Sequence, residues 1–223
     1  MRGFKIILMS LVILAIPACS GPAGGDVAKA PEEKPEPPPP AGDPVVTIQT
    51  IKGDIVVRLR PDLAPNTAER FKIMAMAGFY NRSTFHYVSR GFIQGGDPFS
   101  KDNDPYNDGK GNAAEWINAE FQGDYEVGRG AVGMMRKDTQ PDSSSCQFFI
   151  VLRRKSEWDG KYNIFGEVIE GMEVADAIGD APIIKNDRKL NNYPTAKMTI
   201  KRMRVDYREF PEEAAAEASA SEG

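Results

Sequence analysis

The sequence predicts a mainly β domain whose short antiparallel strands close into a barrel capped by two helices. Runs rich in β-branched and aromatic residues recur from Val45 to Tyr207, and turn-forming residues separate them. Two stretches, 66–78 and 171–178, instead carry apolar residues at helical spacing. Many short strands accompanied by few helices are typical of a closed barrel, in which every strand edge is paired.

The strands at the two ends of the domain carry the clearest patterns. Residues 45–51 and 54–60 flank a turn that contains glycine, which predicts an antiparallel hairpin. The last run, 197–207, alternates with a period of two, except for an interval of three between Ile200 and Met203, which predicts a β-bulge. Further strand-like runs lie at 130–135, 148–152 and 162–168.

The first helix has a predicted start and a predicted end. Asn66 and Glu69 fit a capping box, in which Asn66 is the N-cap and Glu69 reaches back to its amide. Phe71 and Met74 then belong to an apolar face at helical spacing, and Gly78 can end the helix. We expect this helix to cover one end of the sheet.

The first 18 residues are predicted to be a cleavable signal peptide. Arg2 and Lys5 give it a positive start, and the apolar stretch from Ile6 to Ile16 is too short to span a bilayer. Cys19 follows Ile-Pro-Ala, which resembles the lipobox of bacterial lipoproteins, where the signal is cut before a cysteine that is then lipidated. The alternative is an ordinary signal in which Cys19 has no role. A lipidated Cys19 with more than one acyl chain would attach the protein to a membrane.

The composition divides the rest of the chain into three parts. Residues 19–43 are rich in proline and predict an extended linker, residues 44–210 have the length of one domain, and residues 211–223 form an acidic tail that we expect to be disordered. Together with the signal, this predicts a bacterial cell-envelope protein, held by its lipid on the periplasmic side or at the outer membrane. The net charge is −4 and no dense basic run occurs, which argues against a nucleic-acid partner.

The two cysteines give two exclusive possibilities. If Cys19 is lipidated, Cys146 stands alone and no disulfide forms within the chain. The alternative is a bridge between Cys19 and Cys146, which requires the lipidation hypothesis to be wrong.

Two runs contain the candidate functional residues. Residues 85–97 hold the single histidine of the chain, His86, and a Gly-Gly turn, while residues 146–152 form an apolar strand with Gln147 as a polar residue in its interior. A buried glutamine needs a partner or a ligand. We expect His86, between two aromatic residues, to be structural. The combination of aromatic and amide side chains suits the binding of a peptide.

Other chemistries are excluded by the residues. One histidine and one cysteine in the domain do not provide an ordinary zinc site or a Cys/His pair, and no Gly-x-Ser-x-Gly motif occurs. Asp104, Asp108, Gly109 and Glu115 match four positions of an EF-hand calcium loop, but Tyr106 occupies a position that normally coordinates the ion. We therefore predict a solvated loop, with no metal and no cofactor.

Several motifs together resemble the cyclophilin family of peptidyl-prolyl isomerases. They occur in collinear order from about Val45 to Asp206. These motifs are Phe85-His86, Gly91-Phe92, Gln94-Gly95-Gly96-Asp97, Gln147-Phe148-Phe149-Ile150, Trp158, Asp159-Gly160-Lys161 and residues 165–172. The resemblance implies an eight-stranded antiparallel barrel capped by two helices, and an enzyme that accelerates rotation about X-Pro bonds in proline-containing polypeptides.

The resemblance also implies roles for individual residues. Phe92 and Phe149 would form the floor of the proline pocket, with Met135 or Ile93 beside them. The other expected roles are polar positioning by Gln94 and Gln147, backbone pairing around Met135 and Arg136, and a rim formed by Trp158 and Tyr162.

The sequence departs from the family pattern within the run 85–97. Tyr87 stands where the family has an arginine that donates to the prolyl nitrogen, and only one residue separates Phe92 from Gln94 where two are usual. We hypothesise that Arg90 partly replaces the missing donor. Two functions follow from this: a lipid-anchored prolyl isomerase for exported proteins, or a proline-peptide binding or chaperone module with weak catalysis.

Overall fold

The computed structural model describes residues 40–210, and every structural statement below concerns this part of the chain. The predicted signal peptide, Cys19, most of the linker and the acidic tail lie outside the described residues. Within residues 40–210, no helix is long and apolar enough to cross a membrane.

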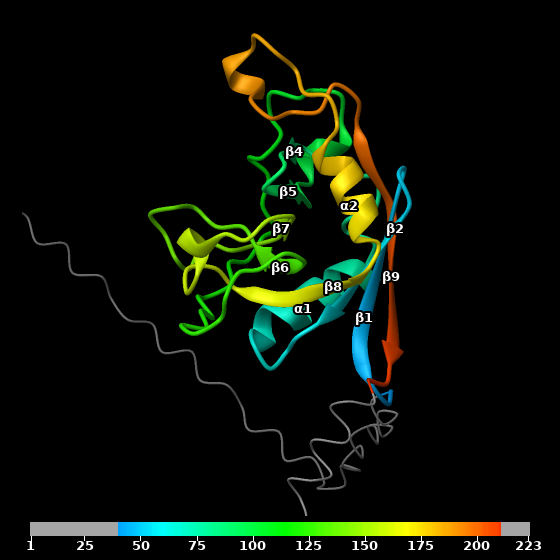
Figure 1. The fold of residues 1–223 in the computed structure, drawn as a ribbon, viewed down its shortest axis with the longest axis vertical. Helices are drawn as coiled ribbons and strands as arrows, with labels where there is room; N and C mark the ends of the chain where they lie inside the picture. Colours follow the sequence, from blue (N-terminus) through cyan, green and yellow to red (C-terminus); the bar gives the residue numbers. More distant parts are fainter. Residues whose placement is uncertain (1–39, 211–223) are drawn as a thin grey trace, which may run out of the picture. The chain divides into compact units, whose positions relative to one another are not determined.

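Nine antiparallel strands form one sheet in the order β3-β9-β1-β2-β8-β6-β7-β5-β4, and Figure 1 shows the sheet curling around the core. The strands are β1 Asp43–Thr50, β2 Asp54–Leu59, β3 Thr84–Phe85, β4 Tyr87–Val88, β5 Phe92–Gly95, β6 Ala131–Met134, β7 Phe148–Val151, β8 Ile164–Glu170 and β9 Met198–Arg208.

The expected closed barrel of eight strands is not confirmed. The sheet has nine strands, and no described ladder pairs β3 with β4, which stand at the two ends of the order. The physical reason is a change of partner at His86. Thr84 pairs with Thr199 of β9, whereas Tyr87, only three residues later, pairs with Gln94 of β5. The two end strands, β3 and β4, are therefore joined covalently through His86, and no described backbone ladder pairs them.

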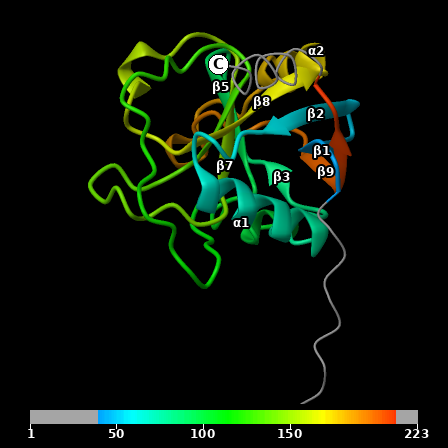
Figure 2. The same cartoon turned by 90° about the horizontal axis from the view of Figure 1, so that it is seen from below.

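Two α-helices pack against the sheet, as the sequence predicts. Helix α1, Pro65–Met76, contacts β1, β8 and β9, while α2, Met172–Gly179, contacts β2 and β5. Figure 2 shows the two helices on opposite sides of the strands. The mainly β class with two covering helices is thus confirmed.

The predicted hairpin and bulge are both confirmed. Strands β1 and β2 pair in antiparallel register on either side of a turn at Lys52-Gly53. Along the β1–β9 ladder, Gln49 pairs with Arg202 but Thr50 pairs with Ile200, so one extra residue, Lys201, lies between the paired positions. The break in the two-residue period located this irregularity correctly.

The predicted capping box at the start of α1 is wrong. The N-cap residue is Ala64, and no side chain of the helix itself caps it. The Glu120 carboxylate from a distant loop accepts hydrogen bonds from the backbone amides of Asn66 (2.9 Å) and Thr67 (2.8 Å) and from both of their side chains. Burial acts to raise the pKa of Glu120, but these donors outweigh it and hold the pKa below its usual value.

The end of α1 agrees with the sequence. Gly78 has a φ of +71°, and the amides of Gly78 and Phe79 donate to the carbonyls of Ala75 and Met74. This pair of bonds is a Schellman motif, which satisfies the last carbonyls of the helix.

The core contains two apolar clusters. The larger one, under α1 and α2, includes the fully buried rings of Phe71, Tyr80, Phe85, Phe148 and Phe165. The smaller one gathers around Phe149, next to β6 and β7, and Phe92 and Trp158 pack against it. The smaller cluster includes most of the aromatic residues that the sequence analysis assigned to a binding site.

Because Glu120 replaces a local N-cap, we expect Glu120→Ala to destabilise the protein by about 1–2 kcal/mol. The folded-state pKa of Glu120 is depressed, so its contribution is present above the unfolded value of 4.5 and is lost as the pH falls. Thermal unfolding at pH 7 and pH 4 measures both effects. The matched control is Glu209→Ala, which removes an exposed glutamate. Equal stability of the Glu120 variant and the wild type at pH 7 would contradict this account.

Candidate active site

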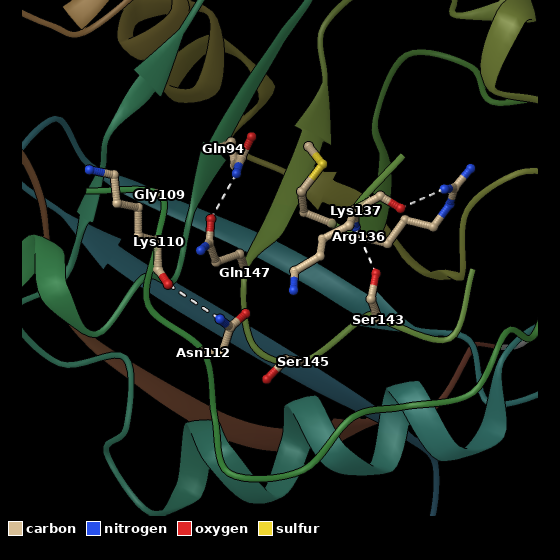
Figure 3. A pocket seen from close by; sticks show the side chains of 10 residues that line it. Gln94, Gly109, Lys110, Asn112, Arg136, Lys137, Ser143, Ser145 and Gln147 are labelled. Atoms are coloured by element: carbon tan, nitrogen blue, oxygen red, sulfur yellow. Dashed lines mark hydrogen bonds between the residues drawn. The ribbon is translucent and has the colours of Figure 1, made fainter. Parts of the chain in front are cut away.

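Two glutamines form the polar centre of the candidate site. Gln147 precedes β7 and is 8 % exposed, and Gln94 lies on the neighbouring strand β5. Gln94 Nε2 donates to Gln147 Oε1 at 2.8 Å, and Gln147 Nε2 donates to the Gly111 carbonyl at 2.8 Å. Figure 3 shows the first of these bonds across the cavity. The partner that a buried glutamine requires is therefore Gln94 on one side and a loop backbone on the other.

An aromatic cluster lies beside this polar centre. Trp158 packs on Phe92 and on Phe149 with ring centroids 4.8 Å apart in each case, and Tyr162 contacts both Phe149 and Trp158. A Cβ on Gly133 would overlap the Phe149 ring, so the glycine of β6 makes room for it. The structure thus brings together four of the residues that were expected to form the proline pocket.

The cluster is more closed than the resemblance suggested. Phe149 is 0 % exposed, because Trp158 and Tyr162 cover it. A ligand that contacts the ring of Phe149 therefore has to displace neighbouring side chains such as Trp158 or Tyr162. Trp158, which was expected at the rim, thus packs directly on the ring that was expected to form the floor of the pocket.

The alternation of β5 settles which of its residues face the site. Phe92 and Gln94 are partly exposed on one face of the strand, whereas Ile93 is fully buried in the larger core cluster. Met135 packs against the smaller aromatic cluster, and its amide donates to the Gln147 carbonyl at 2.7 Å. Of the two residues expected beside the proline pocket, Met135 is adjacent to it and Ile93 is not.

Tyr87 shares a face of the sheet with Gln94 and Phe92. It is the cross-strand partner of Gln94, and its ring stacks on Phe92 with centroids 4.8 Å apart and an interplanar angle of 16°. Tyr87 thus places an aromatic ring next to the site, at the position where the family pattern has an arginine.

Arg90 is not part of this group. Its side chain is 77 % exposed and pairs with Asp180, which follows α2, at 3.2 Å. The guanidinium lines a different cavity, together with Arg129 and Asp176. The structure therefore gives no support to a substitute donor at Arg90. A cation that does lie over the aromatic cluster is Lys155, whose Nζ is 5.7 Å from the centroid of Phe92.

A further cavity of about 220 Å³ adjoins the cavity drawn in Figure 3 and shares Gln94 and Gly109 with it. His86 lines this cavity, and neither of its ring nitrogens has a hydrogen-bond partner among the described residues. Burial lowers the pKa of His86, and the negative charge of Asp97, which acts to raise this pKa, only partly offsets the effect. Burial also raises the pKa of Asp108, beside Tyr193, to about 6. No local sequence pattern indicates that Asp108 and Tyr193 meet here, because they are far apart along the chain.

Metal-binding side chains and the Cys146 thiol were the other candidates for chemistry in the domain. No group of metal-binding side chains gathers between residues 40 and 210. Burial raises the pKa of the Cys146 thiol to about 11, so the thiol stays protonated at neutral pH and is a poor nucleophile. The arrangement is suited to binding a peptide noncovalently, with apolar rings beside two amide side chains.

Comparisons with known proteins identify the family of the chain. Residues 45–205 match the family model described as cyclophilin type peptidyl-prolyl cis-trans isomerase/CLD. The chain belongs to the cyclophilin family. In this cyclophilin, the match covers all nine strands except the ends of β1 and β9.

Individual proteins with similar sequences are also peptidyl-prolyl cis-trans isomerases by name. Peptidyl-prolyl cis-trans isomerase-like 3 of Dictyostelium discoideum is 32% identical over 160 residues, which cover 70% of this chain and 94% of that protein. Peptidyl-prolyl cis-trans isomerase cyp15 of Rhizopus delemar is 33% identical over 158 residues, 69% of this chain, and the match spans only 24% of that longer protein. Peptidyl-prolyl cis-trans isomerisation is accordingly the activity of this cyclophilin.

A solved structure is also similar. It is a cyclophilin type peptidyl-prolyl cis-trans isomerase of Cryptosporidium parvum, crystallised in the presence of the dipeptide Ala-Pro. The two proteins are 25% identical with a TM-score of 0.65, and the match covers 74% of this chain and 99% of the other.

Because Trp158 covers Phe149, we expect a proline peptide to move it. In the variant Trp116→Phe, Trp158 is the only tryptophan of the chain. Addition of an Ala-Pro peptide should then change the intensity and wavelength of the tryptophan emission, whereas the matched Ala-Ala peptide should not. Saturable binding of the Ala-Pro peptide with unchanged emission would show that Trp158 keeps its place.

Proposed function

We propose that this cyclophilin accelerates the isomerisation of X-Pro bonds in exported polypeptides by binding the twisted bond without covalent chemistry. Rotation about such a bond faces a barrier of about 18–20 kcal/mol because amide resonance must be broken. A site that binds the twisted form better than either planar form lowers this barrier. The observation that carries the proposal is the hydrogen-bonded Gln94–Gln147 pair beside the aromatic cluster.

The proposed roles follow the positions of the side chains. Phe92, and Phe149 once Trp158 has moved, provide the apolar surface for the proline ring. Gln94 orients the substrate carbonyl, and Gln147 holds Gln94 in place through their hydrogen bond. The roles proposed for the edge of the site are backbone pairing with the peptide at Met135 and Arg136, and packing on the substrate by Trp158 and Tyr162.

Tyr87 sets an expected limit on the rate. A donor aimed at charge that develops in the transition state typically contributes about 10²–10³-fold to the rate. Tyr87 stacks on Phe92 and does not supply the cation of the family pattern. We therefore propose a slower isomerase than one with the full pattern. Arg90 is omitted from the proposed machinery, because its guanidinium pairs with Asp180.

We further propose that the protein works at a membrane surface in the bacterial cell envelope. The support is in the sequence: a short apolar signal, a cysteine at position 19 and a proline-rich linker. A lipid on Cys19 would hold the domain near polypeptides that have just crossed the membrane. Metabolic labelling with a radioactive fatty acid tests this, since Cys19→Ser should abolish the label.

A proline-peptide binding or chaperone module is the second candidate function. Two observations favour it: Tyr87 in place of the arginine, and the complete burial of Phe149 under Trp158 and Tyr162. Such a module would bind proline segments of unfolded clients and release them with little change in the rate of isomerisation.

Exchange NMR on an Ala-Pro peptide with the full chain distinguishes the two functions. We expect the wild type to accelerate cis/trans exchange, Phe92→Ala to reduce the acceleration by about tenfold or more because it removes apolar contact with the proline ring, and Arg90→Ala to leave it unchanged.

Binding of the peptide without faster exchange would refute the isomerase and support the binding module. A slower rate in Arg90→Ala, with normal thermal stability, would restore Arg90 as a substitute donor.

A further inference from the structure

A cavity of about 390 Å³ opens beside the Gln94–Gln147 pair, and its charged lining is entirely positive. Lys110, Arg136 and Lys137 line it, and no aspartate or glutamate does. The chain as a whole carries a net charge of −4. The cavity is therefore a local positive region on an acidic protein, directly next to the proposed catalytic pair.

The three cations are not neutralised by protein carboxylates. In the part of the chain that the structure describes, none of them forms an ion pair. Lys110 Nζ donates to the Tyr106 carbonyl at 2.7 Å, and Lys137 Nζ lies 5.0 Å from the centroid of the Trp116 ring. These contacts leave both ammonium groups with hydrogen-bonding capacity for a further acceptor, because each can donate three hydrogen bonds.

The cations differ in how freely they can reach a ligand. The Arg136 guanidinium donates to the backbone carbonyls of Lys161, Lys137 and Asp138, which hold it at the edge of the cavity. The Lys137 ammonium, by contrast, points into the space between Gln147 and Ser143 in Figure 3. Its backbone amide is fixed by a 2.8 Å hydrogen bond to Ser143 Oγ, so the base of this side chain is held in place.

Neutral polar groups complete the lining. Asn112 Nδ2 donates one hydrogen to the Lys110 carbonyl at 3.2 Å and keeps the other for a ligand, whereas the Ser145 hydroxyl, which also lines the cavity, donates to the Ala113 carbonyl. Hydrogen bonds from ammonium and amide donors to an ionised carboxylate are shorter and stronger than those to a neutral acceptor. The Lys110 and Lys137 ammonium groups, together with the second amide hydrogen of Asn112, suit a carboxylate better than a neutral amide.

We propose that this cavity binds an acidic side chain of the client, an aspartate or glutamate close to the isomerised proline, and that Lys137 and Lys110 select it. This inference rests on the proposed function, because the cavity is continuous with the Gln94–Gln147 pair that would hold the X-Pro bond. It defines the substrate class as acidic proline-containing segments.

The test compares peptides that differ only in whether one side chain carries a carboxylate, as in Glu, or a neutral amide, as in Gln. Ala-Pro peptides carry either Glu or Gln at one of the positions flanking the dipeptide, and NMR measures both the Kd and the catalysed exchange with the full chain. At low salt we expect the best-placed Glu peptide to bind about threefold to tenfold more tightly than its Gln counterpart. The difference should shrink in 0.5 M NaCl, because salt screens accessible charges.

Substitution of the two lysines tests whether they cause the preference for Glu over Gln. In the double variant Lys110→Gln/Lys137→Gln, the ratio of the Glu and Gln affinities should fall to about one. The matched control, Lys52→Gln, removes an exposed lysine of the β1–β2 turn and should keep the wild-type ratio.

Each outcome decides the question. Equal affinity for every Glu and Gln pair in the wild type, or a preference that persists in the double variant, overturns the inference while the isomerase proposal stands on the exchange rates. A Glu preference without acceleration supports the inference and favours the binding module. No binding of any peptide overturns both proposals.

Discussion

The hydrogen bonds of Gln147 are the interaction on which the site depends. Its side chain joins Gln94 on β5 to the Gly111 carbonyl in the loop before β6, and its backbone carbonyl accepts from Met135 beyond β6. Asp97 holds the other side of the same loop by accepting from the Gly111 amide at 3.3 Å. A buried amide without these partners would lower the stability of the fold by about 1–3 kcal/mol. The hydrogen bonds of Gln147 therefore hold these segments in fixed positions relative to one another. The positive cavity and the proposed catalytic pair both result from this arrangement.

The aromatic cluster shows a balance between stability and access. Trp158 and Tyr162 bury Phe149 completely, and Tyr87 stacks on Phe92. Edge-to-face and stacked pairs of this kind stabilise the folded state by about 0.5–1.5 kcal/mol each. In the proposed mechanism, these contacts are exchanged for contacts with a proline ring when a client binds.

Sequence patterns predicted those parts of the molecule that depend on local chemistry. The hairpin at Lys52-Gly53, the bulge before Met203 and the glycine that ends α1 each follow from the conformational preferences of a few neighbouring residues. The motifs also placed Gln94 and Gln147 in one site. The sequence did not predict the Glu120 cap, because its partners lie more than 50 residues away along the chain, nor the burial of Phe149, which depends on the packing of Trp158. Sequence spacing also could not show that Arg90 faces Asp180, because Arg90 lies in the bend between β4 and β5 and its partner is 90 residues away along the chain.

We expect the Gln147 network to position the proposed catalytic pair, and the variant Gln147→Leu removes this network while leaving the rest of the site in place. Leucine keeps an apolar volume in the strand but cannot accept from Gln94 or donate to Gly111. Exchange NMR on an Ala-Pro peptide, with thermal unfolding as the measure of folding, gives the answer. We expect a folded protein that is less stable by about 1–3 kcal/mol and whose catalysed exchange is slower by about tenfold or more. A folded Gln147→Leu variant with the exchange rate of the wild type would contradict this expectation.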